Sequence, residues 1–321
     1  MKKTIIGLLL AALTLFTTAC GGEVPEMTTD TTAAISESTQ EATTPKPEIT
    51  WMTLPADRTL TAKQYFVYSC ETGEFLTIAE NRDTKIYPAS VTKLFTAYVA
   101  LQYLKPTQVL TAGDVHKRLE TGSSIAEIWQ GDYLPVENLI EGMLLPSGND
   151  AAYILAEAAG KVMYGEQASL VTSEEAVSRF VQEMNAQAKL LGMTGTHFVN
   201  PHGIHDENHY TTYGDLAILA TLVLEDPFIM KYTAVSKAEV TAPSGIKKWK
   251  NTNMIIDPES QYYCPYATGL KTGQTSAAGS CLLSSFEYGG QTLIIGVFGC
   301  PNLDDRFPDT LQLFNQAIGA P

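Results

Sequence analysis

Strand-like patterns lie near both ends of the chain. Short runs rich in β-branched and aromatic residues, bounded by turn residues, are typical of β-strands. The segment 269–275 predicts one such strand, punctuated by glycine, and 238–242 is also strand-like. Two pairs of runs predict β-hairpins, at 64–69 with 75–79 and at 280–286 with 291–298.

Helical patterns occupy the middle of the chain, where apolar positions recur every three to four residues. The predicted helices are one that begins near Ser90 and those at about 134–145, 149–163, 173–191, 216–224 and 308–318. Ser173 is expected near the N-cap of its helix, and Gly192 marks the end of that helix. Helices between terminal strands predict an α+β fold. An antiparallel sheet of about five strands is built from both termini and flanked by helices, with an all-helical lobe inserted at about 96–230.

The first 49 residues differ in pattern from a folded domain. Two lysines precede the apolar run 5–16, which is too short to span a bilayer as a permanent helix. The charged start, the short apolar core and the small residues before Cys20 resemble a bacterial lipoprotein signal at 1–20, in which the cysteine is lipidated. Such signals usually carry Leu where Thr17 stands, and the alternative is an ordinary signal peptide with a chance cysteine.

The segment 21–49 predicts a disordered tether. It holds mostly Thr, Ser, Glu, Ala and Pro, and such a composition cannot bury enough apolar surface to offset its ordering entropy. A flexible coil of about 30 residues spans on the order of 30 Å. Residues 50–321 suffice for one large domain. The prediction is an extracytoplasmic protein attached to the membrane through lipid on Cys20.

Charge and cysteine spacing exclude several kinds of partner. The formal net charge is −14, and nucleic-acid binding requires a basic surface, so no nucleic-acid partner is predicted. The cysteines after position 20 form no Cys-x-x-Cys pair and no zinc-ligand spacing. Their pairing cannot be deduced from the sequence, and free buried thiols are favoured for Cys70, Cys264, Cys281 and Cys300.

The segment YPASVTK places Ser90 and Lys93 at the start of a predicted helix. Residues i and i+3 share a helix face, so the Lys93 amine can lie beside the Ser90 hydroxyl. A serine hydroxyl becomes a nucleophile when a nearby base takes its proton. A lysine can be that base if burial and neighbouring positive charge lower its pKa. The spacing alone is not specific, because Ser244 and Lys247 repeat it in a polar loop to which no function is assigned.

Two further motifs could complete a catalytic site. Ser147 and Asn149 form a Ser-x-Asn turn between two predicted helices. Lys271, Thr272 and Gly273 lie on the glycine-punctuated strand, where the lysine would supply a fixed positive charge. Glycine at this point would let a ligand approach the strand backbone closely.

The motifs Ser-x-x-Lys, Ser-x-Asn and Lys-Thr-Gly, in this order, resemble those of the penicillin-recognising serine enzymes. More closely, the chain is similar to the low-molecular-mass penicillin-binding proteins with D-alanyl-D-alanine carboxypeptidase activity, peptidase family S11. The resemblance runs from about Gln64 to Ala317 and includes PASVTKLFTAYVAL, LLPSGNDAA and GLKTGQTSAAGSCLL. It implies an enzyme without cofactor or metal that removes the terminal D-alanine from peptidoglycan stem pentapeptides and that β-lactam antibiotics acylate.

The resemblance also implies roles for single residues. Ser90 would attack the peptide carbonyl and form an acyl-enzyme, and Lys93 would accept its proton. Ser147 would relay a proton to the leaving D-alanine. Asn149 would hold the substrate amide and the lysine.

The strand motif is expected to bind the other end of the substrate. Lys271 and Thr272 would bind the terminal carboxylate, and the backbone N–H groups of Ser90 and Gln274 would form the oxyanion hole. Many relatives carry His where Gln274 stands, a difference that leaves the backbone donor intact. Lys93 and Lys271 should lie near one another, so that like charges lower at least one of their pKa values.

A zinc site is the alternative for the histidines of PHGIHDENH, His202, His205 and His209. The family has a loop under the active-site lobe at this place, so no metal is predicted. Asn253, in the segment 249–253, is predicted to be structural rather than to line the cleft.

Two other functions remain as alternatives. A class A β-lactamase of the same fold needs a glutamate-activated water, normally from a Glu-x-x-Leu-Asn loop. No Asn of this chain has Glu four residues before it, which disfavours that function. A catalytically silent β-lactam-binding module is the other alternative. Sensors of this kind usually add a membrane-spanning transducer, and the chain has no second apolar run of membrane length.

Overall fold

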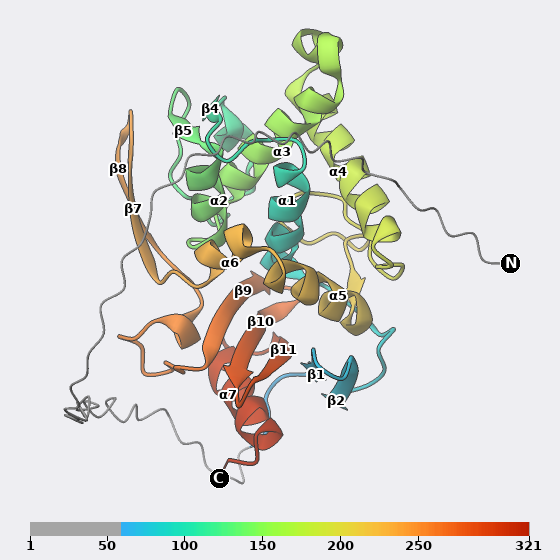
Figure 1. The fold of residues 1–321 in the computed structure, drawn as a ribbon. Helices are drawn as coiled ribbons and strands as arrows, with labels where there is room; N and C mark the ends of the chain where they lie inside the picture. Colours follow the sequence, from blue (N-terminus) through green and yellow to red (C-terminus); the bar gives the residue numbers. More distant parts are fainter. Residues whose placement is uncertain (1–58, 321) are drawn as a thin grey trace, which may run out of the picture. The chain divides into compact units, whose positions relative to one another are not determined.

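The computed structural model describes residues 59–320. Its centre is a five-stranded antiparallel sheet with the strand order β2-β1-β11-β10-β9 (Figure 1). The sheet joins the first and last parts of the described chain, which confirms the predicted fold. Its strands are β1 Gln64–Ser69, β2 Glu74–Ile78, β9 Ala267–Thr275, β10 Gly279–Tyr288 and β11 Gln291–Cys300.

Strands β10 and β11 are buried on both faces and so contribute to two cores. Their connecting turn uses Gly289 and Gly290, both at positive φ (59° and 80°), as the tight hairpin turn requires. One face of the sheet packs against the helices of the middle of the chain. The other face packs against α7 Arg306–Ala317, where Phe286 stacks on Phe314 with ring centroids 4.3 Å apart.

Helix α1 Thr92–Leu101 lies at the centre of the helical half (Figure 1). Eight of its ten residues are buried, because helices pack against it on several sides. A helix that is apolar almost all round belongs in a core. The helices around it are α2 Val136–Leu144, α3 Asn149–Met163, α4 Ser173–Leu190, α5 Tyr213–Leu224 and α6 Pro227–Thr233.

Shorter elements complete the described part of the chain. Three two-stranded ribbons pair β3 Lys85–Ile86 with β6 Thr211–Thr212, β4 Val109–Thr111 with β5 Tyr133–Pro135, and β7 Lys237–Ala242 with β8 Gly245–Lys250. Short 3₁₀ turns are η1 Ala89–Val91, η2 Val115–Arg118, η3 Gly165–Leu170 and η4 Met254–Ile256. Of the ribbon strands only β7 was predicted, and the lobe expected to be all-helical also holds the β4–β5 ribbon.

The helix bounds agree with the predictions to within three residues, with two corrections. The N-cap of α4 is Thr172, not Ser173. Its hydroxyl accepts from the Glu175 N–H while the Glu175 carboxylate accepts from the Thr172 N–H, a capping box. Helix α6 was not predicted: Asp226 caps it and Pro227 is its first residue.

The predictions for the N-terminal part, a lipoprotein signal at 1–20 with Cys20 and a tether at 21–49, lie outside the described residues. Within 59–320, no helix combines the length and apolarity that crossing a membrane requires.

The four cysteines after position 20 are free thiols, as the sequence favoured. Cys70 is partly exposed, and the other three are buried. Burial raises the pKa of Cys281 to about 12 and that of Cys264 to about 11. Thiols that remain protonated in this way are poor nucleophiles, so these cysteines are structural.

Candidate active site

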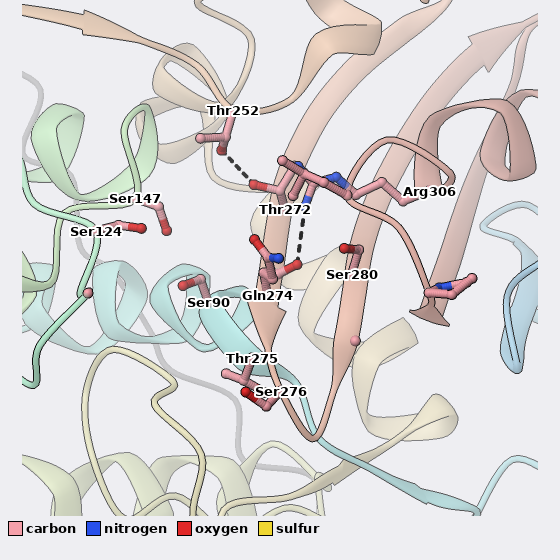
Figure 2. Close-up of a pocket in the computed structure, with 15 residues that line it drawn as sticks. Ser90, Ser124, Ser147, Thr252, Thr272, Gln274, Thr275, Ser276, Ser280 and Arg306 are labelled. Atoms are coloured by element: carbon pink, nitrogen blue, oxygen red, sulfur yellow. Dashed lines mark hydrogen bonds between the residues drawn. The ribbon is translucent and has the colours of Figure 1, made fainter.

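A polar cleft of about 630 Å³ lies between β9 and the helical half. Its walls come from parts of the chain that are far apart in sequence: the turn before α1, the loop before α3, and strand β9 (Figure 2). The side chains that line it include Ser90, Ser124, Ser147, Thr272, Gln274 and Arg306.

Ser90 lies in η1, directly before α1, and Lys93 lies in the first turn of α1. The Lys93 Nζ atom is 2.8 Å from Ser90 Oγ and donates to the backbone carbonyl oxygen of His202, also at 2.8 Å. The first distance is short enough for direct proton transfer from a hydroxyl to a general base. The structure therefore brings the predicted nucleophile and base together.

The surroundings of Lys93 favour its neutral form. Burial lowers the pKa of Lys93 well below the usual 10.5, the charge of Lys271 lowers it further, and Asp150 acts in the opposite direction. Lys271 is also buried, and burial together with the charge of Arg306 lowers its pKa to about 7. A general base must be unprotonated to accept a proton, so these shifts suit Lys93 to that role.

Two glycines let their segments approach the nucleophile closely. A Cβ atom at Gly203, where φ is +89°, would lie 1.9 Å from the Ala89 carbonyl oxygen and 3.0 Å from the Ser90 nitrogen. A Cβ atom at Gly273 would lie 2.9 Å from the Ala89 Cβ and 3.2 Å from the Ser90 nitrogen. Gly273 was expected to admit a ligand to the strand, and the structure shows that it also admits the turn that carries Ser90.

Ser147 and Asn149 come from the loop before α3 and the first residue of that helix. Ser147 has a positive φ of 65°, which is uncommon for a residue other than glycine and is often found at functional sites. Its hydroxyl is buried and has no hydrogen-bond partner among the described residues, although Figure 2 shows it at the edge of the cleft. Asn149 is buried, and its backbone N–H donates to the Ser124 carbonyl at 2.9 Å. Its side chain is not among those that line the cleft.

Strand β9 presents its motif at the edge of the sheet. Lys271 does not line the cleft, because its Nζ is buried and donates to the Thr272 carbonyl at 3.2 Å. Its charge can therefore affect a bound ligand only electrostatically, from behind the cleft wall. The Thr272 hydroxyl lies in the cleft, 2.5 Å from the hydroxyl of Thr252 (Figure 2). The Gln274 side chain is exposed into the same cleft.

Several residues that line the cleft were missed in the sequence, among them Arg306 and Thr252, which contact the Lys-Thr-Gly strand. Arg306, the first residue of α7, is buried and donates from Nη1 to the Gly273 carbonyl at 3.2 Å. Thr252 connects Thr272 to the loop before α3, because its backbone N–H donates to the Leu145 carbonyl at 3.1 Å. Neither Arg306 nor Thr252 belongs to a short motif. The only feature of the sequence that could have pointed to Arg306 is its place next to the final predicted helix. Asn253 is structural, as predicted, since it caps η4.

The histidines at 202, 205 and 209 lie around the start of α1. The backbone of His202 accepts from Lys93, and His209 Nε2 lies 2.8 Å from the hydroxyl of Thr92. Burial lowers the pKa of His209 to about 4. His205 makes an edge-on contact with a tyrosine ring. Within residues 59–320, no three His, Cys, Asp or Glu side chains gather as metal ligands.

The second Ser-x-x-Lys pair also forms, at the β7–β8 turn. Lys247 Nζ lies 2.8 Å from Ser244 Oγ, as in the first pair. Here, however, the buried Asp132 accepts from the Ser244 hydroxyl at 2.7 Å and lies 3.6 Å from Lys247 Nζ. Neither Ser244 nor Lys247 lines the cleft. The pair ties the hairpin to the segment before β5 and is structural.

A serine beside a buried lysine, a second unpaired serine hydroxyl and a cationic strand edge define the site of a serine acyl-transfer enzyme. Residues 51–302 match the family model described as D-alanyl-D-alanine carboxypeptidase, peptidase S11. The chain belongs to this family.

Among curated proteins, the chain is 31% identical over 262 residues to the D-alanyl-D-alanine carboxypeptidase DacF of Bacillus subtilis, covering 80% of this chain and 62% of that protein. It is 30% identical over 270 residues to the D-alanyl-D-alanine carboxypeptidase DacA of Escherichia coli K12, covering 81% and 61%. The chain thus spans about three fifths of the length of these relatives.

Solved structures share the fold. The Streptomyces K15 DD-transpeptidase matches with a TM-score of 0.72 and 28% identity, covering 82% of this chain and 98% of that one. Penicillin-binding protein D2 from Listeria monocytogenes, in the cefotaxime-bound form, matches with a TM-score of 0.65 and 30% identity, covering 82% and 99%.

Proposed function

We propose that this protein is a serine D-Ala-D-Ala carboxypeptidase, which removes the terminal D-alanine from peptidoglycan stem pentapeptides through an acyl-enzyme. The observation that carries the proposal is the contact between Ser90 and the buried Lys93 at a cleft that Ser147 and Thr272 also line. The family and the names of its relatives support this activity. β-Lactams would acylate the same serine, and the similar Listeria protein has been solved with cefotaxime bound.

Acylation begins when Ser90 Oγ attacks the carbonyl carbon between the last two D-alanines, while its proton passes to Lys93 Nζ. The carbonyl oxygen becomes an oxyanion, which the backbone N–H groups of Ser90 and Gln274 would stabilise. One such donor typically contributes about 10²–10³ in rate. The C–N bond then breaks, and the leaving nitrogen takes up the proton from Lys93 by way of the Ser147 hydroxyl. The unpaired state of that hydroxyl supports this role, since it is free to bond a substrate atom.

The substrate carboxylate is proposed to bind where the cleft is cationic. The Thr272 hydroxyl and the guanidinium of Arg306 line this end of the cleft, and the charge of Lys271 lies beneath it. Arginine suits a carboxylate because its planar group presents several donors at once. No substrate contact is assigned to Asn149, because its buried side chain does not line the cleft.

Deacylation uses the same groups in reverse order. A water molecule attacks the ester carbonyl and gives a proton to the neutral amine of Lys93. Collapse of the second tetrahedral intermediate breaks the bond to Ser90 Oγ, which recovers its proton from Lys93. The shortened stem peptide leaves as a carboxylate.

The alternatives are less well supported by the composition of the site. A class A β-lactamase activates water with a glutamate, and neither Asp nor Glu is among the described residues that line the cleft. A silent binding module is disfavoured because the contact between Ser90 and Lys93 is formed.

Release of D-alanine from a D-Ala-D-Ala peptide tests the proposal. Ser90→Ala should abolish release, whereas Ser244→Ala should retain it, because Ser244 has the same spacing and lysine contact but lies outside the cleft. Rapid turnover of penicillin without peptide cleavage would identify a β-lactamase instead. Stable acylation by penicillin without cleavage of any peptide would identify a binding module.

We also propose that the protein acts outside the cytoplasm, anchored by lipid on Cys20, which becomes the mature N-terminus when the signal is cleaved before it, with 21–49 as its tether. The two lysines, the apolar run and the small residues before Cys20 support this. Mass spectrometry of the mature N-terminus should find a diacylated cysteine, and Cys20→Ser should prevent lipidation. An unmodified N-terminus within 21–49 would indicate an ordinary signal peptide.

A further inference from the structure

A second cavity of about 530 Å³, here called the adjoining pocket, lies at the turn between β9 and β10, next to the catalytic cleft. The two cavities share the wall residues Ser276, Gly279 and Pro301. The adjoining pocket is further lined by Lys63, Glu80, Lys85 and Tyr87. A peptide bound in the cleft can therefore continue along this wall.

The proposed function fixes which part of the substrate extends toward the adjoining pocket, and the inference rests on it. Figure 2 shows Thr272, Gln274 and Thr275 in that order along β9, with Ser90 beside Gln274. If the terminal carboxylate binds at Thr272 and the attacked carbonyl lies at Ser90, the remainder of the stem must extend past Thr275. That direction leads to Ser276, where the two cavities meet.

The residue that precedes the D-Ala-D-Ala pair has the reach to enter the adjoining pocket. An extended peptide advances about 3.3 Å per residue, so this residue lies one step beyond the acyl group. Tyr87 lines the adjoining pocket and is three residues before Ser90, so their Cα atoms are at most about 11 Å apart. A long side chain on the preceding residue spans most of this distance.

Three charged side chains line the adjoining pocket, and each has a contact with its surroundings. The Glu80 carboxylate accepts from the hydroxyl of Thr84 at 3.0 Å. The stem of Lys63 lies against Gly299, where an added Cβ would be 3.1 Å from the Lys63 Cβ. Lys85 Nζ lies 3.9 Å from the centroid of a tyrosine ring and forms a cation–π contact with it. Within residues 59–320, Glu80 and Lys63 form no ion pair, so the pocket offers one carboxylate and one ammonium group to a ligand.

We propose that the adjoining pocket is a subsite for a charged side chain on the residue before the D-Ala-D-Ala pair, with Glu80 binding its free amine. A diamino acid at this position supplies that amine. If the side chain also carries a carboxylate, Lys63 binds it. The cleft recognises the D-Ala-D-Ala end, and the adjoining pocket selects the stem peptide.

Three peptides that differ only in this side chain test the proposal: a free amine, the same amine acetylated, and an amine with a carboxylate. Glu80→Gln should lower kcat/KM for both peptides with a free amine by up to about fivefold, the scale of an exposed ion pair. The change should appear in KM, because uniform binding is lost, and it should fade at high salt. Lys63→Met should affect only the peptide that carries the carboxylate.

The controls separate this subsite from the catalytic proposal. Glu74→Gln removes an exposed carboxylate on β2 that lines neither cavity and should change no rate. The acetylated peptide should be cleaved equally by the parent protein and by Glu80→Gln. Equal loss on free and acetylated peptides, or no loss on either, would overturn the subsite while D-alanine release still supported the carboxypeptidase. Absence of release from all three peptides would overturn the proposed activity itself.

Discussion

Gly203 fixes the position of the nucleophile, and alanine in its place should displace Ser90. The added methyl group would lie 1.9 Å from the Ala89 carbonyl oxygen, 2.4 Å from its carbon and 3.0 Å from the Ser90 nitrogen. These are backbone atoms, so no side-chain rotation can relieve the overlap. Restoring an ordinary contact requires the loop and the turn before α1 to separate by about 1.5 Å in a closely packed interior.

The expected loss of activity follows from this displacement. A misplacement of about 1 Å at a reacting group costs about 10²-fold in rate, so Gly203→Ala should slow acylation by at least about that factor. The positive φ of +89° adds strain of about 1–2 kcal/mol for any residue with a side chain. Gly192 provides a matched control, because its φ is +85° and no atom of the described residues lies within 4 Å of an added Cβ. Gly192→Ala should lose stability to a similar extent and keep its acylation rate.

The assay is the second-order rate of acylation by a fluorescent penicillin, with thermal unfolding measured on the same samples. A loss of 1 kcal/mol should lower Tm by about 2–4 °C for a domain of this size. If Gly203→Ala fails to fold, Gly273→Ala remains as a milder case, with a Cβ 2.9 Å from that of Ala89 and no positive φ. Acylation of both variants at the rate of Gly192→Ala would refute the reasoning.

Three further predictions concern protons and the carboxylate end of the cleft. Acylation should rise with pH through the lowered pKa of Lys93 and level off well below 10.5, because the neutral amine is the base; a rate still climbing near pH ~10 would contradict this. KM for a D-Ala-D-Ala peptide should rise as the pH passes about 7, where Lys271 loses its charge, and Lys271→Met should give a high KM that no longer varies over this range. Thr252→Val removes the bond to Thr272 and should raise KM about two- to tenfold, for a hydrogen bond of about 0.5–1.5 kcal/mol. Steady-state kinetics with an unchanged KM would show that Thr272 is positioned without Thr252.

Local sequence patterns predicted most of the fold, because in its long strands and helices the pattern of apolar residues agrees with the structure that the segment adopts. Strands β10 and β11 are apolar runs around a Gly-Gly turn, and helix α3 was predicted with its observed bounds. The missed elements depend on tertiary contacts. Strand β8 has the sequence GIKKWK, which is too polar for a strand pattern, and it forms because it pairs with β7. Helix α6 has only seven residues, too few for a clear periodicity.

The residues of the site also fall into those that a local pattern predicts and those that depend on tertiary contacts. The three motifs identified Ser90, Ser147 and Thr272, since their chemistry is tied to spacing along the chain. Arg306 could not be found like this, because it reaches the Gly273 carbonyl across 33 positions of sequence. Its position depends on how α7 packs against the sheet, which no short pattern encodes.

The two serine–lysine pairs of this chain have the same spacing and the same 2.8 Å contact, yet their surroundings differ. Asp132 lies 3.6 Å from Lys247 Nζ and accepts from the Ser244 hydroxyl at 2.7 Å. Asp132 thus contacts both members of this pair: it forms an ion pair with the lysine, and the serine proton is already bonded to its carboxylate. Lys93 instead lies beside a backbone carbonyl. Burial lowers the pKa of Lys93, the charge of Lys271 lowers it further and Asp150 acts in the opposite direction, so its neutral form is favoured and the serine proton can be transferred to it. The groups that surround the serine and the lysine, which the motif does not specify, therefore decide whether such a pair can react.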